Sequence, residues 1–218
     1  MLGFDHKHPA AHCWDVWGHT THTVDAVEPT PVLRLAALLH DGGKPACYRF
    51  DAEAGRGRFY NHPKVGAALA DGILQRLRCD NATRETVCTL VSLHQHRCED
   101  SPKAMRRLLS KYGEETLTLL WKLRRADAAA HAPLFRDTLL AKAAGEEALF
   151  DAVRREGGCL RVSDLAVNGR DLMALGYAPG PELGSTLQQL LERVLDEELE
   201  NDRDALLKAA RKIKEDTP

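Results

Sequence analysis

Six residues in this 218-residue chain have the side chains and the order along the sequence to bind metal ions together. They are His19, the adjacent pair His40 and Asp41, then His62, His94 and Asp127. Imidazole nitrogens combined with carboxylate oxygens suit divalent transition metals such as Fe, Mn, Co, Ni or Zn better than Ca or Mg. Because the cysteines form no C-x-x-C pair, a structural zinc site is not expected. The set predicts one or two divalent transition metals as cofactors.

The adjacent pair His40 and Asp41 indicates what such metals would do. Asp41 has two carboxylate oxygens and can bridge two neighbouring cations while His40 binds one of them. Two metals about 3.5–4 Å apart can activate a hydroxide and neutralise the oxygens of a phosphate during in-line attack. We therefore expect Asp41 to be a catalytic residue as well as a ligand, and the substrate to be a phosphate ester.

The elements that must position these residues are helices almost throughout. Apolar side chains recur at helical spacing in most of the chain, which predicts an all-α fold. Residues 47–60 lack this period and predict an exposed loop or a small hairpin beside the site. Ser163 has the residue type of an N-cap for a short helix. The expected helices are 31–40, 63–77, 81–94, 114–131, 139–156, 168–175, 182–198 and 202–214.

The helix expected over 114–131 places a carboxylate on its buried face. Leu117, Leu120, Arg124, Asp127 and His131 share one face at helical spacing. A buried carboxylate stays ionised only beside a partner such as a metal or a cation. Arg124 is therefore a second catalytic candidate, which either orients Asp127 or reaches the phosphate of the substrate. We assign His131 to a surface or supporting role.

Composition limits the partners of the chain. Its formal net charge is −2 and its pI is about 6.6, so no overall positive field draws it onto nucleic acid, and contact with tRNA would be local. The longest apolar run is far too short to cross a bilayer, so we expect no membrane association. Scattered cysteines behind a polar N-terminus predict reduced thiols and a cytoplasmic protein of unknown oligomeric state.

His19, the pair His40 and Asp41, and Asp127 resemble the defining pattern of the HD-domain metal-dependent phosphohydrolases, whose motif H-D-x-G-K occupies positions 40–44. The resemblance implies an HD-domain helical bundle and makes Lys44 a catalytic residue that neutralises phosphate. From its position alone, Lys44 could simply be a cation at the end of a helix. Gly42 stands where the family usually has Ile or Val, which loosens the end of the helix by about 1 kcal/mol.

His62 and His94 are similar to the two extra histidines of the subgroup of HD proteins that binds two metals. His62 lies in the string H-P-K-V-G-A, and His94 ends an apolar helical stripe. The resemblance implies that both are metal ligands. In a site with a single metal, the two imidazoles would contact the phosphate of the substrate instead.

A wider resemblance covers nearly the whole chain and connects it to the C-terminal half of bacterial CCA tRNA nucleotidyltransferases that carry an HD domain. The polymerase head of that family opens with a Gly-Gly-Ser/Thr turn and a paired-acid D-x-D, a combination that is absent here. The chain resembles the hydrolase half without the nucleotide-adding half. The matching strings are DVWGHT at 15–20, LRLAALLHDGGKP at 33–45, GRGRFYNHPKVGA at 55–67, LRRAD at 123–127 and DLAVNGRDLMALGYAPGPELG at 164–184.

The resemblance implies two domains and favours one of three functions. Residues 1–135 would form the HD domain, and 136–218 a C-terminal helical extension like the body and tail that hold tRNA. The favoured function is a phosphohydrolase acting on nucleotides, 2′,3′-cyclic phosphates or phosphomonoesters. The alternatives are a tRNA-binding module or partner of a separate nucleotidyltransferase head with a vestigial HD site, and a degenerate structural remnant.

Overall fold

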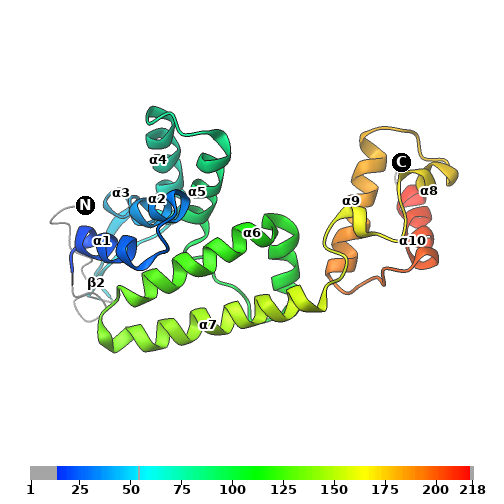
Figure 1. Ribbon diagram of the computed structural model, residues 1–218. Helices are drawn as coiled ribbons and strands as arrows, with labels where there is room; N and C mark the ends of the chain where they lie inside the picture. Colours follow the sequence, from blue (N-terminus) through cyan, green and yellow to red (C-terminus); the bar gives the residue numbers. More distant parts are fainter. Residues whose placement is uncertain (1–13, 54, 217–218) are drawn as a thin grey trace. The chain divides into compact units, whose positions relative to one another are not determined.

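The computed structural model describes residues 14–53 and 55–216, and most of them are helical (Figure 1). The prediction of an all-α fold is confirmed. Within the described residues, no helix is both long enough and apolar enough to span a bilayer. The helices are α1 Val16–Ala26, α2 Pro31–Leu39, α3 Lys44–Cys47, α4 His62–Arg76, α5 Asn81–Leu93, α6 Pro102–Ala129, α7 Pro133–Glu156, α8 Gly169–Ala174, α9 Pro181–Leu195 and α10 Arg203–Asp216.

The described residues pack into two units. Unit 1 holds the described residues up to Cys98 together with Glu114–Ala148, and unit 2 holds Glu99–Gly113 and the residues from Leu149 onward. Gly113 marks the division within α6, because its φ of 77° and ψ of 162° interrupt the helix there. The domain boundary expected between 135 and 136 stays a prediction.

The ends of most helices agree closely with those expected from the sequence. The start of α2 shows why the ends can be predicted. Pro31 occupies the first turn, and the Thr30 hydroxyl accepts a hydrogen bond from the Leu33 amide at 3.4 Å. One helix is longer than expected, because α7 already begins at Pro133. The break at Gly113 divides α6 into the helix expected from residue 114 and a further helical segment from Pro102 that was not expected.

Of two local expectations, one agrees with the structure and the other does not. Residues 47–60 form a hairpin of two antiparallel strands, β1 Tyr48–Asp51 and β2 Arg56–Phe59, which is one of the two alternatives predicted for that segment. The prediction that Ser163 is an N-cap is wrong, because Ser163 lies inside a short 3-10 turn, Val162–Asp164. Asp164 has the capping role instead, since its carboxylate accepts hydrogen bonds from the amides of Leu160 and Arg161.

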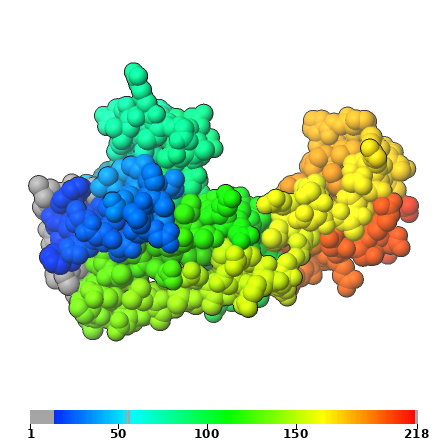
Figure 2. All heavy atoms as spheres, in the orientation of Figure 1, coloured from blue at the N-terminus to red at the C-terminus, as the bar shows by residue number. Residues whose placement is uncertain are grey.

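Unit 1 is built around α2, which carries the His40-Asp41 pair at its end. Both α1 and α5 pack against α2, and α4 packs against α5. The surfaces of α1 and α2, in blue, form one continuous mass in Figure 2. Leu33, Leu74, Leu90 and Trp121 are almost fully buried. Because α2 is surrounded in this way, the residues that follow its last turn enter the centre of the unit.

Unit 2 has a core of its own. Leu172 of α8, Leu190 of α9 and Leu206 of α10 are completely buried against one another. The Tyr177 hydroxyl donates a hydrogen bond of 2.7 Å to the carbonyl of Ala210, which ties the turn after α8 to α10. None of the six predicted metal-binding residues lies in this unit.

A close backbone contact at Gly43 joins the end of α2 to the start of α4. A Cβ atom placed on Gly43 would lie 2.3 Å from the carbonyl oxygen of His62 and 2.7 Å from the amide nitrogen of Gly66. Only glycine permits backbones to approach this closely. At neighbouring Gly42 a Cβ would meet a single atom, the Leu39 carbonyl oxygen at 3.2 Å. Gly43 therefore fixes where His62 sits, and Gly42 does not.

We expect Gly43→Ala to destabilise the protein, because either α4 or the turn must move to make room for the methyl group. The cost should be about 1–3 kcal/mol, which lowers the unfolding temperature by roughly 2–12 °C. Gly42→Ala is the matched control and should change the unfolding temperature much less. Thermal unfolding followed by circular dichroism measures both, and equal shifts for the two variants would contradict the contact.

Candidate metal centre

The structure brings the six predicted residues together in the interior of unit 1. His19 lies in α1, His40 and Asp41 follow the last residue of α2, and His62 is the first residue of α4. His94 caps the end of α5, and Asp127 is near the end of α6. Apart from Asp127, whose side chain is 16% exposed, each of them is at most 3% exposed.

The two carboxylate oxygens of Asp41 face two different pairs of imidazoles. Oδ1 lies 3.4 Å from Nε2 of His62 and 3.8 Å from Nε2 of His94. Oδ2 lies 3.3 Å from Nε2 of His40 and 3.8 Å from Nε2 of His19. A carboxylate with a pair of nitrogen donors at each oxygen has the arrangement of a bridging ligand between two cations.

Asp127 adds a second carboxylate on the side of His19 and His40. Its Oδ1 lies 2.8 Å from Nε2 of His19 and 3.7 Å from Nε2 of His40. His131, one turn further along, completes a group with His19 and Asp127 in which the donor atoms lie within 4.8 Å of one another. His131 was not among the predicted ligands, although its place four residues after Asp127 puts both on one helical face.

The backbone fixes how the four buried histidines present their rings. In each, Nδ1 hydrogen-bonds to a main-chain carbonyl, which can only accept, so Nδ1 carries a proton and Nε2 points into the cluster. This tautomer is the one that a metal ligand bound through Nε2 requires. The carbonyls are those of Ala130 for His19 at 3.3 Å, Ala37 for His40 at 2.7 Å, Phe59 for His62 at 2.8 Å and Val91 for His94 at 2.7 Å.

Buried polar atoms at the centre of the cluster fit a bound cation. Nε2 of His40 and both carboxylate oxygens of Asp41 are buried and have no hydrogen bond among the described residues. Lys44 offers partial compensation as an ion pair, with Nζ 2.7 Å from Oδ2 of Asp41. Burying such atoms without partners is costly. A divalent metal bound by these oxygens and nitrogens would remove that cost.

Charge coupling within the cluster moves several pKa values. Burial by itself lowers the pKa of His40, but the neighbouring carboxylates of Asp41 and Asp127 outweigh it and raise this pKa to about 9. Burial together with the charge on His40 lowers the pKa of His94 to about 3. Although burial opposes it, the surrounding cationic groups hold the pKa values of both carboxyls well below their usual range. The carboxylates are therefore ionised at neutral pH.

Arg124 supports the cluster from outside it. Nε donates to the carbonyl of His94 at 3.1 Å and an Nη donates to that of Leu93 at 3.0 Å, so the guanidinium caps the end of α5. Another Nη pairs with Glu146 of α7 at 2.5 Å. These contacts place Arg124 as a positioning residue for His94. The described contacts include none with Asp127, so the expectation that Arg124 orients that carboxylate finds no support, and a contact with substrate stays a prediction.

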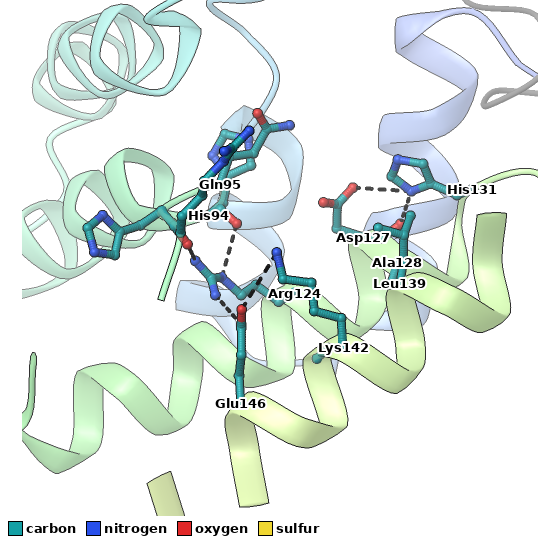
Figure 3. Close-up of a pocket in the computed structure, with 12 residues that line it drawn as sticks. His94, Gln95, Arg124, Asp127, Ala128, His131, Leu139, Lys142 and Glu146 are labelled. Atoms are coloured by element: carbon teal, nitrogen blue, oxygen red, sulfur yellow. Dashed lines mark hydrogen bonds and ion pairs between the residues drawn. The ribbon is translucent and has the colours of Figure 1, made fainter. Parts of the chain in front are cut away.

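A cavity of about 250 Å³ lies next to the cluster (Figure 3). Asp127, His131 and His94 of the cluster line it, and Gln95 and Lys142 add polar groups. Typical pockets for small ligands measure about 300–1,000 Å³, so this cavity has room for part of a ligand, such as a phosphate with adjoining atoms. A group bound there would lie beside the carboxylates and imidazoles.

Comparison with known proteins decides the family. The sequence profile of the family described as tRNA nucleotidyltransferase domain 2 matches residues 64–210, which is more than half of the chain. The chain belongs to this family. The matched region includes His94 and Asp127 of the cluster and most of unit 2. The resemblance to the HD half of the CCA enzymes, inferred from the sequence strings, is confirmed.

Individual relatives agree with the family. The CC-adding tRNA nucleotidyltransferase of Thermus thermophilus is 35% identical over 187 residues, which are 83% of this chain and 41% of that protein. The A-adding tRNA nucleotidyltransferase of Deinococcus radiodurans is 33% identical over 166 residues, 74% of this chain and 37% of that protein. The chain thus spans about two fifths of the length of these relatives. No solved structure matches it significantly.

Metal binding at this centre should release a proton, because a metal can bind Nε2 of His40 only after that nitrogen has lost the proton that it holds below a pKa of about 9. Between pH 6.5 and 8.5, metal affinity should rise by about tenfold per pH unit. Titration calorimetry in buffers with different ionisation enthalpies measures the released proton. The His22→Ala variant, which changes an exposed histidine outside the cluster, should release the same number. An affinity that does not change with pH would contradict the assignment.

Proposed function

We propose that unit 1 is an HD-type, metal-dependent phosphohydrolase that acts on nucleotides, 2′,3′-cyclic phosphates or phosphomonoesters. The proposal rests above all on one observation, the buried Asp41 carboxylate with no hydrogen bond and with a pair of imidazole Nε2 atoms facing each of its oxygens. The HD motif at 40–44 and the family's relation to nucleotide-transferring enzymes support the choice of a phosphoester as substrate.

The residues of the cluster would have different roles in the reaction. One or two divalent transition metals, when bound, would supply Lewis acidity toward a phosphate oxygen and toward the attacking water. His19, His40, His62 and His94 hold their Nε2 atoms ready for that role through hydrogen bonds of Nδ1 to the backbone. Asp41 stays ionised and would orient the attacking water by accepting its hydrogen bond.

Lys44 supports Asp41 electrostatically and is the group that we assign to phosphate neutralisation. Its Nζ is 2.7 Å from Asp41, and its side chain is only 6% exposed. An ammonium group in a buried site that excludes water interacts strongly with nearby oxygens. Arg124 acts indirectly, through His94, because it fixes the end of α5 from which His94 projects.

The double variant His40→Ala with Asp41→Ala should lose both bound metal and phosphoester hydrolysis. We expect hydrolysis of a 2′,3′-cyclic nucleotide and of p-nitrophenyl phosphate, assayed with Ni²⁺ or Mn²⁺, to fall by more than about a hundredfold. Elemental analysis measures the metal. Asp41→Asn, which keeps the size of the side chain, separates loss of the carboxylate from loss of the fold. Hydrolysis at the parent rate in these variants would refute the assignment.

A second function is favoured by a feature of unit 2. The lining of a cavity of about 620 Å³ there includes Arg107, Lys111 and Arg161 together with Glu192, and Arg107 is paired with Asp196. Cationic side chains that contact successive phosphates supply most of the affinity of proteins for RNA backbones. We propose that this surface binds tRNA, either beside a hydrolase site in the same chain or for a separate nucleotidyltransferase head.

Binding to tRNA through this surface should weaken steeply with salt. The combined variant Lys111→Ala with Arg161→Ala should reduce both the affinity at low salt and the slope of log K against log salt, by up to one to two units. Lys208→Ala, which removes an exposed cation of α10 outside the cavity, is the matched control and should leave the slope unchanged. Filter binding measures both quantities. If the parent does not bind tRNA at low salt, this second function is excluded.

A further inference from the structure

The β1–β2 hairpin carries an aromatic face that begins at the metal centre. Pairing of the strands places Tyr48 opposite Phe59 and Phe50 opposite Gly57, so Tyr48, Phe50 and Phe59 lie on the same face. The rings of Tyr48 and Phe59 are in contact, with centroids 5.8 Å apart. Phe50 faces a glycine that offers no side chain to cover it, and it is 64% exposed.

The base of this hairpin is attached directly to the centre. The carbonyl of Phe59 accepts the hydrogen bond from Nδ1 of His62 at 2.8 Å. The ring of Phe59 lies under Lys44, with Nζ 5.7 Å from the ring centroid, and the same Nζ pairs with Asp41. A continuous series of contacts therefore runs from Asp41 through Lys44 and Phe59 to Tyr48. The exposed ring of Phe50 is the next side chain on the same face of the hairpin.

The opposite face of the hairpin is charged. Arg49 pairs across the ribbon with Arg58, and like charges placed opposite each other disfavour pairing unless anions are near. Arg58 is partly compensated by Asp51, at 3.1 Å. Arg49 is exposed, and the ion pairs found among the described residues do not include it. Proteins bind single-stranded nucleic acid with aromatic rings that stack the bases and with cations that attract the backbone, and this hairpin has the rings on one face and the arginines on the other.

We propose that the aromatic face of the hairpin stacks the bases of a single-stranded RNA end and guides its terminal phosphoester to the metal centre. The inference rests on the proposed phosphohydrolase function and narrows its substrate from free nucleotides to the ends of RNA chains. Phe50 stacks a base, and the positive charge of Arg49 and Arg58 on the opposite face favours the approach of the RNA backbone. A base that is paired in a duplex cannot stack in this way, so the surface selects unpaired ends.

Fluorescence anisotropy with the metal-loaded full chain tests the proposal. The probe is a labelled 12-nucleotide RNA that ends in a 3′-phosphorothioate, offered as a single strand and annealed to its complement. We expect Phe50→Ala to weaken binding of the single strand by about fivefold or more, because each stacked base contributes that much or more. Phe50→Trp should retain binding. Binding of the duplex should not depend on Phe50.

The control variant is Leu77→Ala, which removes an equally exposed apolar side chain, 63% against 64%, from the far end of α4. It should change affinity by less than about twofold. The proposal is overturned if the parent does not bind the single strand, or if Phe50→Ala binds it as tightly as the parent does. It is also overturned if Phe50→Ala weakens binding of the duplex as much as binding of the single strand.

A parallel assay separates this proposal from the proposed function. Phe50→Ala should hydrolyse glycerol 2-phosphate at the parent rate, because that substrate has no ring to stack. A fall in this rate would mean that the ring only supports the structure of the centre, and it would overturn the proposal. If the parent binds RNA through Phe50 but hydrolyses no phosphoester, the hydrolase function fails and the assignment of the hairpin surface stands.

Discussion

The need to stabilise one buried carboxylate governs the structure of unit 1. Asp41 is 1% exposed, and an ionised carboxylate withdrawn from water must be compensated by cations or by hydrogen bonds. Its neighbours are Lys44 and four imidazoles, and without a bound cation the cluster retains a proton on His40. The same arrangement that makes Asp41 costly to bury would make it a strong ligand, so we expect the stability of the unit and its affinity for metal to be linked.

The residues around Asp41 are held at the ends of helices rather than in their middles. His40 and His94 each cap a helix and bond through Nδ1 to a carbonyl of the preceding turn, so the end of the helix itself fixes the ring. Gly43 presses the turn after α2 against the start of α4, and Arg124 ties the end of α5 to α6 and α7. Rigid elements that meet at their ends can hold donor atoms within a few tenths of an ångström of a required geometry.

The predicted metal ligands and the cationic cavity lie in different units. Every predicted ligand lies in unit 1, whereas unit 2 has a separate leucine core and a cavity lined by cations. The family match covers His94 and Asp127 of unit 1 and most of unit 2, but it begins at residue 64 and does not include the His40-Asp41 pair. A formal net charge of −2 agrees with this division, because any contact with RNA then has to come from local cationic surfaces.

The sequence alone determined the helical class, most helix ends and the six residues that converge, because periodicity, capping residues and the H-D pair are local patterns. Tertiary structure decided the rest. Nothing local shows that His19 joins Asp127 and His131, or that Arg124 binds the end of α5. His19 and Asp127 are 108 residues apart, and only the packing of their helices brings their side chains within 2.8 Å.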